Sequence, residues 1–447
     1  MLKIFKMAVR NTHRYARRSL LIVSLIAVGV VFVQVYMAAT NSYKNLIISQ
    51  ITDSMLGHIQ VHKKGYLVSV ENVPLNMNLT AEQTARAEAI LKANPMVESY
   101  STRIKLGGMI SNFAETTNIR LAAIDPEEEF KTVPLLPSRV LEGTSSLKPG
   151  EALVPELLAK GMKLKTGDTV VLVATNKDGS VNGKQFTVGG IIETAPGPGG
   201  RDGYILLADA MELLRMDPPE VSEIAVRLKD FGKLEPAFNA LMKAFMQEKT
   251  KDGKPVFEIH TWEKLSPFSA IAKMINMMTL MVKIMLVAIV LIGIMNVMIM
   301  SVYERTREIG TIAAIGTQPN TILAMFMAEG LCLGAAGVIA GNILSVAVIY
   351  GVRLMHVTFA FGMREGFVLT PAVNPVDFSI ISAIVLAVAV FGSLQPAWKA
   401  SRMEPVSVKE HIGEYDAEGT IRIFYNRVHG RNGACRRRRR AAAGSGP

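Results

Sequence analysis

The chain has 447 residues, of which 49% are hydrophobic and 19% are charged, and a soluble domain of this length usually carries more charge. Its formal net charge is +11, but the basic excess lies in the two tails, and residues 40–275 are nearly neutral. A nucleic-acid-binding protein concentrates its basic residues on a folded surface, so this distribution argues against that class. The two cysteines, Cys332 and Cys435, lie in an apolar segment and in a basic tail, so they exclude a disulfide framework for the large domain.

The first predicted element is a membrane helix that follows a basic segment, residues 1–19. Residues 20–39 read LLIVSLIAVGVVFVQVYMAA, and about 20 apolar residues cross the roughly 30 Å hydrocarbon core of a bilayer. A cleaved signal peptide is the alternative, but the apolar run is long and no clear A-x-A site follows it. The preceding segment carries six basic residues and no acidic one: Lys3, Lys6, Arg10, Arg14, Arg17 and Arg18.

Residues 40–275 alternate short strands with amphipathic helices, which predicts an α+β domain. The turn NKDGSVNG joins two of the strands as a β-hairpin. Strands are predicted at 59–62, 97–104, 119–124, 169–174, 186–192, 224–228 and 257–260. Helices are predicted at 81–93, 151–160, 208–216 and 233–247.

This domain is predicted to have two lobes. Residues 126–220 combine a helix, the hairpin, a Gly/Pro-rich loop and a further strand, which indicates a β-rich lobe. The flanking residues 40–125 and 221–275 then form a second, membrane-proximal lobe. Residues 262–281 have apolar residues at helical spacing, so they are either a continuous helix that enters the membrane or a simple connector.

Three more apolar spans follow within residues 276–410. The predicted fold class is therefore an α-helical membrane protein with four transmembrane helices plus an α+β extracytoplasmic domain of two subdomains. Basic flanks lie on the cytoplasmic side of a membrane, which places both termini in the cytoplasm. Residues 411–447 read as a disordered basic tail, in which Arg436–Arg440 suit anionic lipid headgroups. The three spans are residues 282–302, 322–352 and 378–394.

No catalytic or metal site is predicted. The sequence lacks G-x-x-x-x-G-K-[ST], G-x-S-x-G and H-E-x-x-H. His58 and His62 are four residues apart, a spacing that suits metal binding on a helix, but they lie around a predicted strand. The acidic run at residues 125–129 is interpreted as a solvated turn.

Two charged residues and four glycines stand out inside the membrane spans. Lys283 lies at the edge of a span, where its side chain reaches the interface. Glu329 lies two turns into the third span, so it either faces a polar interior or a partner subunit, or it is paired structurally. The glycines permit close helix packing. They are Gly330, Gly334, Gly337 and Gly341.

The most informative motif is the loop SVYERTREIGTIAAIGTQPNTIL between the second and third spans. Four charged residues at 304–308 are followed by an apolar run at 309–315 that ends at Gly316, and the next helix starts at Thr317 or Asn320. A short helix with an apolar face suits a groove on a soluble partner. A simple charged turn is the alternative, but it leaves the apolar run unexplained.

The motif ERTREIGTIAAIG resembles the E-R-x-R-E-I-G-x-x-x-A-x-G loop of the MacB/FtsX/LolC–LolE family of ABC transporter permeases. The segment PAWKASRMEPVSVKE is similar to the family's C-terminal ending, and AVRNTHRYARRSLL to its opening. GEALVPELLAKGMKLKTGD and AEGLCLGAAGVIAGNIL are similar to its outer domain and its third span. The resemblance runs through nearly the whole chain in order.

The resemblance implies a permease subunit of the mechanotransmission type in a bacterial inner membrane, with no cofactor of its own because ATP is bound by a cytoplasmic ATPase dimer. It implies a second permease, identical or paralogous, and a periplasmic lipoprotein or adaptor as a further partner. The cargo would be lipoproteins or other amphipathic molecules; the alternative is an FtsX-like subunit that activates periplasmic cell-wall hydrolases without transport. The implied ATPase-coupling residues are Glu304, Arg305, Arg307, Glu308, Ile309, Gly310, Ala314 and Gly316.

Overall fold

The computed structural model describes Met7, Arg10, Arg14 and residues 16–195, 201–250, 252–361 and 364–402. The chain divides into two compact units. Within the described residues, the helical unit contains 16–39, 279–355 and 371–402, and the mixed unit contains 40–278 and 356–370.

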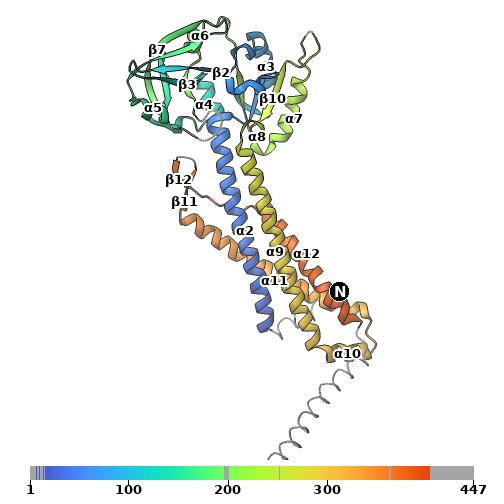
Figure 1. Ribbon diagram of the computed structural model, residues 1–447. Helices are drawn as coiled ribbons and strands as arrows, with labels where there is room; N and C mark the ends of the chain where they lie inside the picture. The colour runs from blue at the N-terminus through green and yellow to red at the C-terminus, as the bar shows by residue number, and fades with distance from the viewer. Residues whose placement is uncertain are drawn as a thin grey trace, which may run out of the picture. The chain divides into compact units, whose positions relative to one another are not determined.

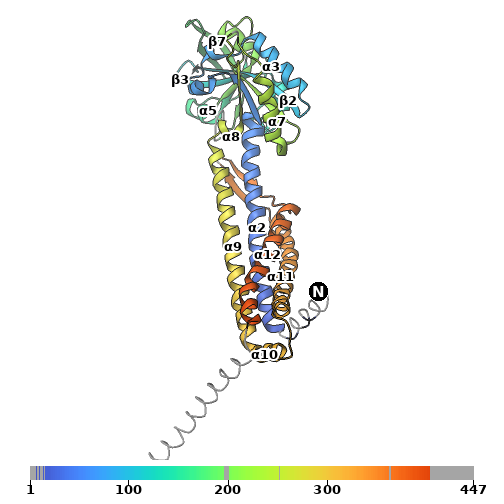
Figure 2. The ribbon, with the colours of Figure 1, turned by 90° about the vertical axis from the view of Figure 1, so that its right-hand side faces the viewer.

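Four long helices are apolar enough to cross a membrane, and each contains one predicted span, so the expected number of spans is confirmed for the described residues. In the helical unit they pack side by side (Figures 1 and 2) around a common apolar core. The first and second also contribute residues to the mixed unit. The helices are α2 (Ala16–Ile51), α9 (Phe268–Glu304), α11 (Pro319–Leu354) and α12 (Pro375–Ser401).

The second of these helices does not begin at residue 262, as a continuous helix over 262–281 requires. A separate turn, α8 (Trp262–Leu265), ends at Ser266, whose backbone is extended (φ −118°, ψ 130°). Pro267 follows, and a proline disfavours the helical conformation of the residue before it. The uninterrupted helix α9 therefore starts at Phe268.

The four glycines that the sequence singled out in α11 lie where other helices approach closely. A Cβ atom built on Gly334 would lie 2.5 Å from the Ala389 side chain of α12, and one on Gly337 would lie 2.6 Å from the Ile26 side chain of α2. Gly330 meets Ser393 of α12 in the same way. The glycine stripe thus faces α12 at one end and α2 at the other, as Gly341 meets Val30.

We expect Gly337→Ala to destabilise the helical unit, because the added methyl group overlaps Ile26 and overpacking costs about 1–3 kcal/mol. Gly351→Ala, on the same helix, is the matched control, since its Cβ meets nothing within 4 Å. Alanine there gains helix propensity of about 1 kcal/mol. Thermal unfolding of both variants in detergent checks this; equal melting temperatures would contradict the packing role.

The mixed unit is built on one ten-stranded sheet with the order β10-β1-β9-β2-β3-β8-β5-β7-β4, to which β6 adds by pairing with β2 and β7. The strands are β1 (Ile59–Lys63), β2 (Val97–Ser111), β3 (Thr116–Ile124), β4 (Val140–Gly143), β5 (Glu151–Pro155), β6 (Thr169–Thr175), β7 (Val181–Ile192), β8 (Gly203–Leu206), β9 (Glu223–Leu228) and β10 (Phe257–Thr261). A separate hairpin is formed by β11 (Thr358–Phe361) and β12 (Arg364–Val368).

Helices cover this sheet, and they are α3 (Ala81–Ala93), α4 (Pro126–Thr132), α5 (Glu156–Met162), α6 (Leu207–Leu214) and α7 (Leu234–Phe245). The start of α3 follows from its sequence, because Thr80 and Gln83 form a reciprocal capping box. The predicted hairpin is confirmed, since β6 and β7 pair from Thr169↔Thr187 to Thr175↔Val181.

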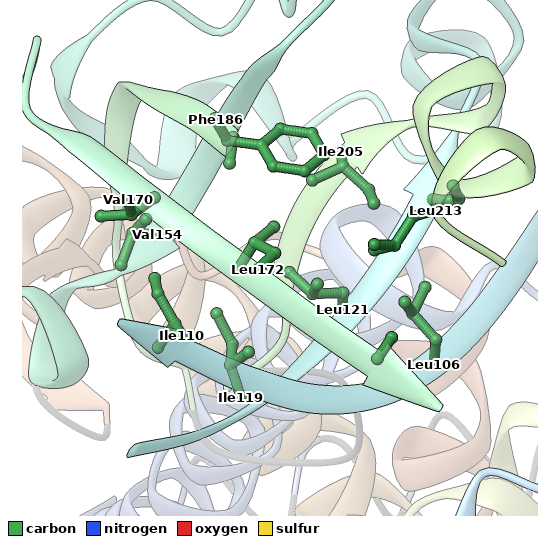
Figure 3. Close-up of a cluster of buried hydrophobic side chains, with 14 of the residues drawn as sticks. Leu106, Ile110, Ile119, Leu121, Val154, Val170, Leu172, Phe186, Ile205 and Leu213 are labelled. Atoms are coloured by element: carbon green, nitrogen blue, oxygen red, sulfur yellow. The ribbon is translucent and has the colours of Figure 1, made fainter. Parts of the chain in front are cut away.

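Two large apolar cores lie along the sheet. One joins β1, β9 and β10 to α3 and α7, and the other joins β2, β3, β5, β6, β7 and β8 to α5 and α6 (Figure 3). The 15-residue strand β2 contributes to both, with Tyr100 packed against the first and Leu106 and Ile110 buried in the second. By these contacts β3 belongs with the β-rich lobe, although its residues precede the boundary placed at residue 125.

Two local predictions are wrong. Residues 151–155 form the strand β5 instead of the first half of a helix, because β7 and β8 pair with them on both sides. Residues 125–129 begin the helix α4 instead of forming a solvated turn. Asp125 caps that helix by accepting from the Glu127 N–H, and Pro126 occupies its first turn.

Candidate functional site

The loop between α9 and α11 contains a short helix, α10 (Thr306–Ala314). Its buried face consists of Ile309, which is 2% exposed and joins the core of the helical unit, and the adjacent Gly310. Arg307 and Glu308 lie on the exposed side. The helix therefore packs on its own bundle by one face and presents a charged face to its surroundings.

The end of α10 leaves an apolar side chain uncovered. Ala314 is exposed, and Ile315 is 80% exposed. Gly316 stops the helix with a left-handed backbone (φ +92°), a conformation that glycine adopts without strain. The next helix begins at Pro319 with Gln318 as its cap, between the two starts that the sequence allowed.

Arg305 does not belong to the exposed face. Its guanidinium donates to the Glu329 carboxylate of α11, with Nη1 and Oε2 3.0 Å apart. The side chains are 5% and 7% exposed. The structure thus brings together two residues that the sequence singled out separately, 24 positions apart, and it ties the start of α10 to the third span.

We expect Arg305→Met to destabilise the helical unit by about 3 kcal/mol, because it leaves the Glu329 carboxylate buried without its cation. The double variant Arg305→Met/Glu329→Met removes both charges and should recover part of the loss. Thermal unfolding in detergent measures both. Coupling between the residues would be contradicted if the stability lost in the double variant equalled the sum of the losses in Arg305→Met and Glu329→Met.

Glu308 has a contact of a different kind. Its Oε1 lies 3.9 Å from Nη1 of Arg14, and both side chains are more than half exposed. Exposed ion pairs contribute little to stability. Glu308 therefore remains accessible to a partner.

A polar network inside the bundle has no counterpart among the predicted site residues. The Gln34 amide of α2 donates to Asn342 of α11 (2.7 Å), and Asn342 donates to Ser382 of α12 (3.0 Å). Ser345 donates to Gln34 as well. The amides of Gln34 and Asn342 inside otherwise apolar runs are the signal that could have indicated it, because polar groups in a membrane interior hydrogen-bond across helices. Lys283, the other charged residue that the sequence singled out in the membrane spans, lies on α9 and is half-buried.

The mixed unit contains a second group of buried charges. Arg103 of β2 contacts Glu129 of α4 (2.7 Å) and Glu223 of β9 (2.9 Å), and all three side chains are at most 6% exposed. Lys105 contacts Asp202 at 2.8 Å. Burial alone would raise the pKa of Glu223, but the neighbouring Lys105, His62 and Arg103 side chains hold that pKa well below its usual range.

The two histidines considered for metal binding have other contacts. His58 Nδ1 accepts a hydrogen bond from the Leu228 N–H (3.0 Å), and His62 Nε2 faces Glu223 at 3.9 Å. Within the residues that the structure describes, no group of three His, Cys, Asp or Glu side chains is placed to hold a metal ion.

Two family models match the chain. Residues 19–244 match the MacB-like periplasmic core domain, and residues 280–405 match the FtsX-like permease C-terminal domain. The loop with α10 lies inside the second match, and the ten-stranded sheet lies mostly inside the first.

Two curated proteins illustrate the similarity. The lipoprotein-releasing system transmembrane protein LolC of Neisseria meningitidis serogroup B is 23% identical over 399 residues, which cover 85% of this chain and 91% of that protein. The macrolide export ATP-binding/permease protein MacB of Nitrobacter winogradskyi is 36% identical over 109 residues, covering 24% of this chain and 15% of that protein. Among solved structures, the periplasmic region of MacB from Actinobacillus actinomycetemcomitans covers 46% of this chain and 89% of its own, at 14% identity and a TM-score of 0.34.

Proposed function

Since this chain belongs to the family of ABC transporter permeases that join a MacB-like periplasmic core domain to an FtsX-like C-terminal domain, we propose that it couples ATP hydrolysis by a separate ATPase to motion of its periplasmic domain. The observation that carries this proposal is α10. It offers Arg307, Glu308 and Ile315 to a partner on one side. On the other side it is anchored through Ile309 and Arg305 to the bundle.

The anchoring supports transmission of force through the membrane. A push on α10 reaches α11 through the Arg305–Glu329 ion pair, and it reaches the core through Ile309. Helices α2 and α9 each contribute residues to both units without a break in the helix. Movement of these two helices then changes the conformation of the mixed unit. This is the route of mechanotransmission, and it needs no channel for cargo through the membrane.

The cargo that we propose is a lipoprotein or another amphipathic molecule. The support is the relative from Neisseria meningitidis, which is named for lipoprotein release and is covered over 91% of its length. The alternative is a signalling subunit of the FtsX type that activates periplasmic cell-wall hydrolases. Two large cores in the mixed unit favour the transporter.

The remaining assignments follow from the same proposal. Both chain ends lie in the cytoplasm, the mixed unit lies in the periplasm of an inner membrane, and the ATP is bound by the partner. A second permease, identical or paralogous, completes the assembly, with a periplasmic lipoprotein or adaptor as a further partner.

Affinity purification of the tagged chain, followed by mass spectrometry, tests the proposal. We expect an ABC ATPase in at least equal amount and lipid-modified peptides that are released when ATP is added. Recovery of a periplasmic amidase with no lipid-modified peptide would favour the signalling alternative. Absence of any ATPase would contradict the coupling itself.

A further inference from the structure

The mixed unit contains a pocket of about 470 Å³, within the range of small-molecule sites. Two of its walls are the segments that connect the long helices to the sheet. Met55 and Leu56 belong to the π-helical turn η1 (Thr52–Leu56) directly after α2. Leu265 and Pro267 directly precede α9.

The remaining apolar wall comes from the 3₁₀ segment η2 (Tyr66–Asn72), which contributes Leu67 and Val70. Both side chains are apolar, and both are partly exposed. One side of the pocket is therefore a lipophilic surface that is open to a ligand.

The polar part of the lining carries positive charge. Lys105, Arg120 and Glu223 line it together with His62 and Tyr66. Glu223 is already engaged by Arg103 at 2.9 Å and by Lys105 at 3.8 Å. The Arg120 side chain is 49% exposed, and its ion pair with Asp202 is long, at 3.5 Å, while Lys105 contacts the same carboxylate at 2.8 Å. The Arg120 guanidinium is thus available to an anion.

Two buried atoms in this part of the lining have no hydrogen-bond partner among the described residues, the Tyr66 hydroxyl and His62 Nδ1. Tyr66 is fully buried and His62 is 1% exposed. Their rings stack with centroids 5.1 Å apart, so both atoms are held in place. Both atoms are enclosed by the protein, so the contact with an anion falls to the exposed Arg120 guanidinium.

We propose that this pocket binds a single-chain anionic amphiphile, with a carboxylate or phosphate head at Arg120 and an acyl chain along Leu67, Val70 and Leu265. The head accepts hydrogen bonds from the guanidinium. The chain covers the lipophilic wall. This site belongs to the mixed unit, and the proposal holds whether or not lipoproteins are the cargo.

The position of the pocket gives such a ligand a consequence. Its occupant touches the turn after α2 and the turn before α9 at once. Binding then fixes these two connections relative to the sheet. The amphiphile is therefore an effector of the mixed unit, distinct from a molecule carried across it.

Photoaffinity labelling of the full chain in lipid nanodiscs tests this inference. The probe is palmitate with a diazirine at mid-chain, compared with the matching hexadecanol probe. We expect the acid probe to label peptides that contain residues 66–73 and 265–267, and excess palmitate to compete. Labelling confined to the membrane helices, or equal labelling by acid and alcohol, would overturn the proposal.

Matched variants locate the site. Val70→Trp fills the pocket and should reduce labelling of these peptides at least about fivefold, whereas Val68→Trp, at a side chain that is 93% exposed and outside the lining, should change it less than about twofold. Arg120→Gln should reduce labelling by the acid probe about tenfold, since a charge-assisted hydrogen bond is lost. Arg120→Gln alters an exposed side chain, so it stays informative even if Val70→Trp misfolds. Equal labelling of wild type and Arg120→Gln, or of the two tryptophan variants, would refute the site.

A phosphate head is distinguished from a carboxylate head by competition. If the pocket recognises the negative charge of the head group, lysophosphatidate and palmitate both displace the probe. The stronger competitor shows whether the site prefers a phosphate or a carboxylate head. Failure of both to displace it would count against the proposal. None of these outcomes depends on ATPase binding, so they are separate from the test of coupling.

Discussion

Replacing Arg103 by methionine is expected to lower the free energy of unfolding of the mixed unit by about 3–5 kcal/mol, because two buried carboxylates lose their cation. Glu129 and Glu223 both contact Arg103 within 2.9 Å. Unfolding is followed by the fluorescence of Trp262, which is 2% exposed, in a Trp398→Phe background.

The control for this variant is Arg86→Met. Arg86 also pairs with two carboxylates, Glu82 and Glu248, but its side chain is 50% exposed. Exposed pairs contribute about 0–1 kcal/mol, so this variant should change stability little. Equal losses in the two variants would show that burial does not govern the effect. Arg103→Met/Glu129→Leu should recover part of the stability, since one unpaired carboxylate is removed.

The same cluster predicts an acid dependence. The pKa of Glu223 is depressed in the folded chain because Lys105, His62 and Arg103 together outweigh burial, which by itself raises it. A depressed carboxyl pKa stabilises the fold above the unfolded value of about 4.3, and this contribution is lost as the pH falls below it. The unfolding free energy should therefore fall as the pH drops below about 5, and less steeply for Glu223→Gln than for the wild type.

The second large effect is expected at α10. Ile315→Asp should reduce stimulation of the partner ATPase and cargo release at least about tenfold, because an apolar anchor buried at an interface contributes about 2 kcal/mol. Ile315 is 80% exposed, so the fold and membrane insertion should be unchanged. ATPase rate with and without cargo, in nanodiscs that contain the complete assembly, measures the effect.

The control for Ile315→Asp is Val181→Asp, which places the same charge on an apolar side chain that is 67% exposed, in the hairpin of β6 and β7. It should leave ATPase stimulation unchanged. Glu308→Ala and Gly310→Ala separate the two faces of α10. Loss of stimulation with Glu308→Ala indicates an exposed contact, whereas loss of thermal stability with Gly310→Ala indicates the buried face. Full stimulation by both Ile315→Asp and Glu308→Ala would contradict docking at α10.

The four membrane helices and most strands were predictable because their signals are local. Apolar runs of about 20 residues, the Thr80–Gln83 capping box and the Asp178-Gly179 turn all act over a few residues. Residues 151–155 were wrongly predicted as helix because Glu, Ala and Leu favour helices. The strands that pair with them, β7 and β8, come from distant parts of the chain.

The site was predictable in outline and not in detail for the same reason. The motif at residues 304–316 indicates a docking helix, but nothing in its spacing tells that Arg305 turns inward to Glu329. Glu129 is a similar case. Its neighbours in sequence suggest solvent, and its burial depends on Arg103, 26 positions earlier. Contacts between distant residues are set by tertiary packing, which a single sequence does not display.

The long strand β2 also bears on how this domain can be altered by evolution or by design. Arg103 and Glu223 are direct partners in the β2–β9 register, so the stretch between them begins and ends at neighbouring points of the sheet. Segments with adjacent ends are exchanged between proteins with little disturbance of the host. We therefore expect that the β-rich lobe can be exchanged as a unit, with this residue pair at its boundary. A replacement lobe from a relative would have to return a carboxylate to the place of Glu129 and a donor to the Ser54 carbonyl, which Arg139 supplies here.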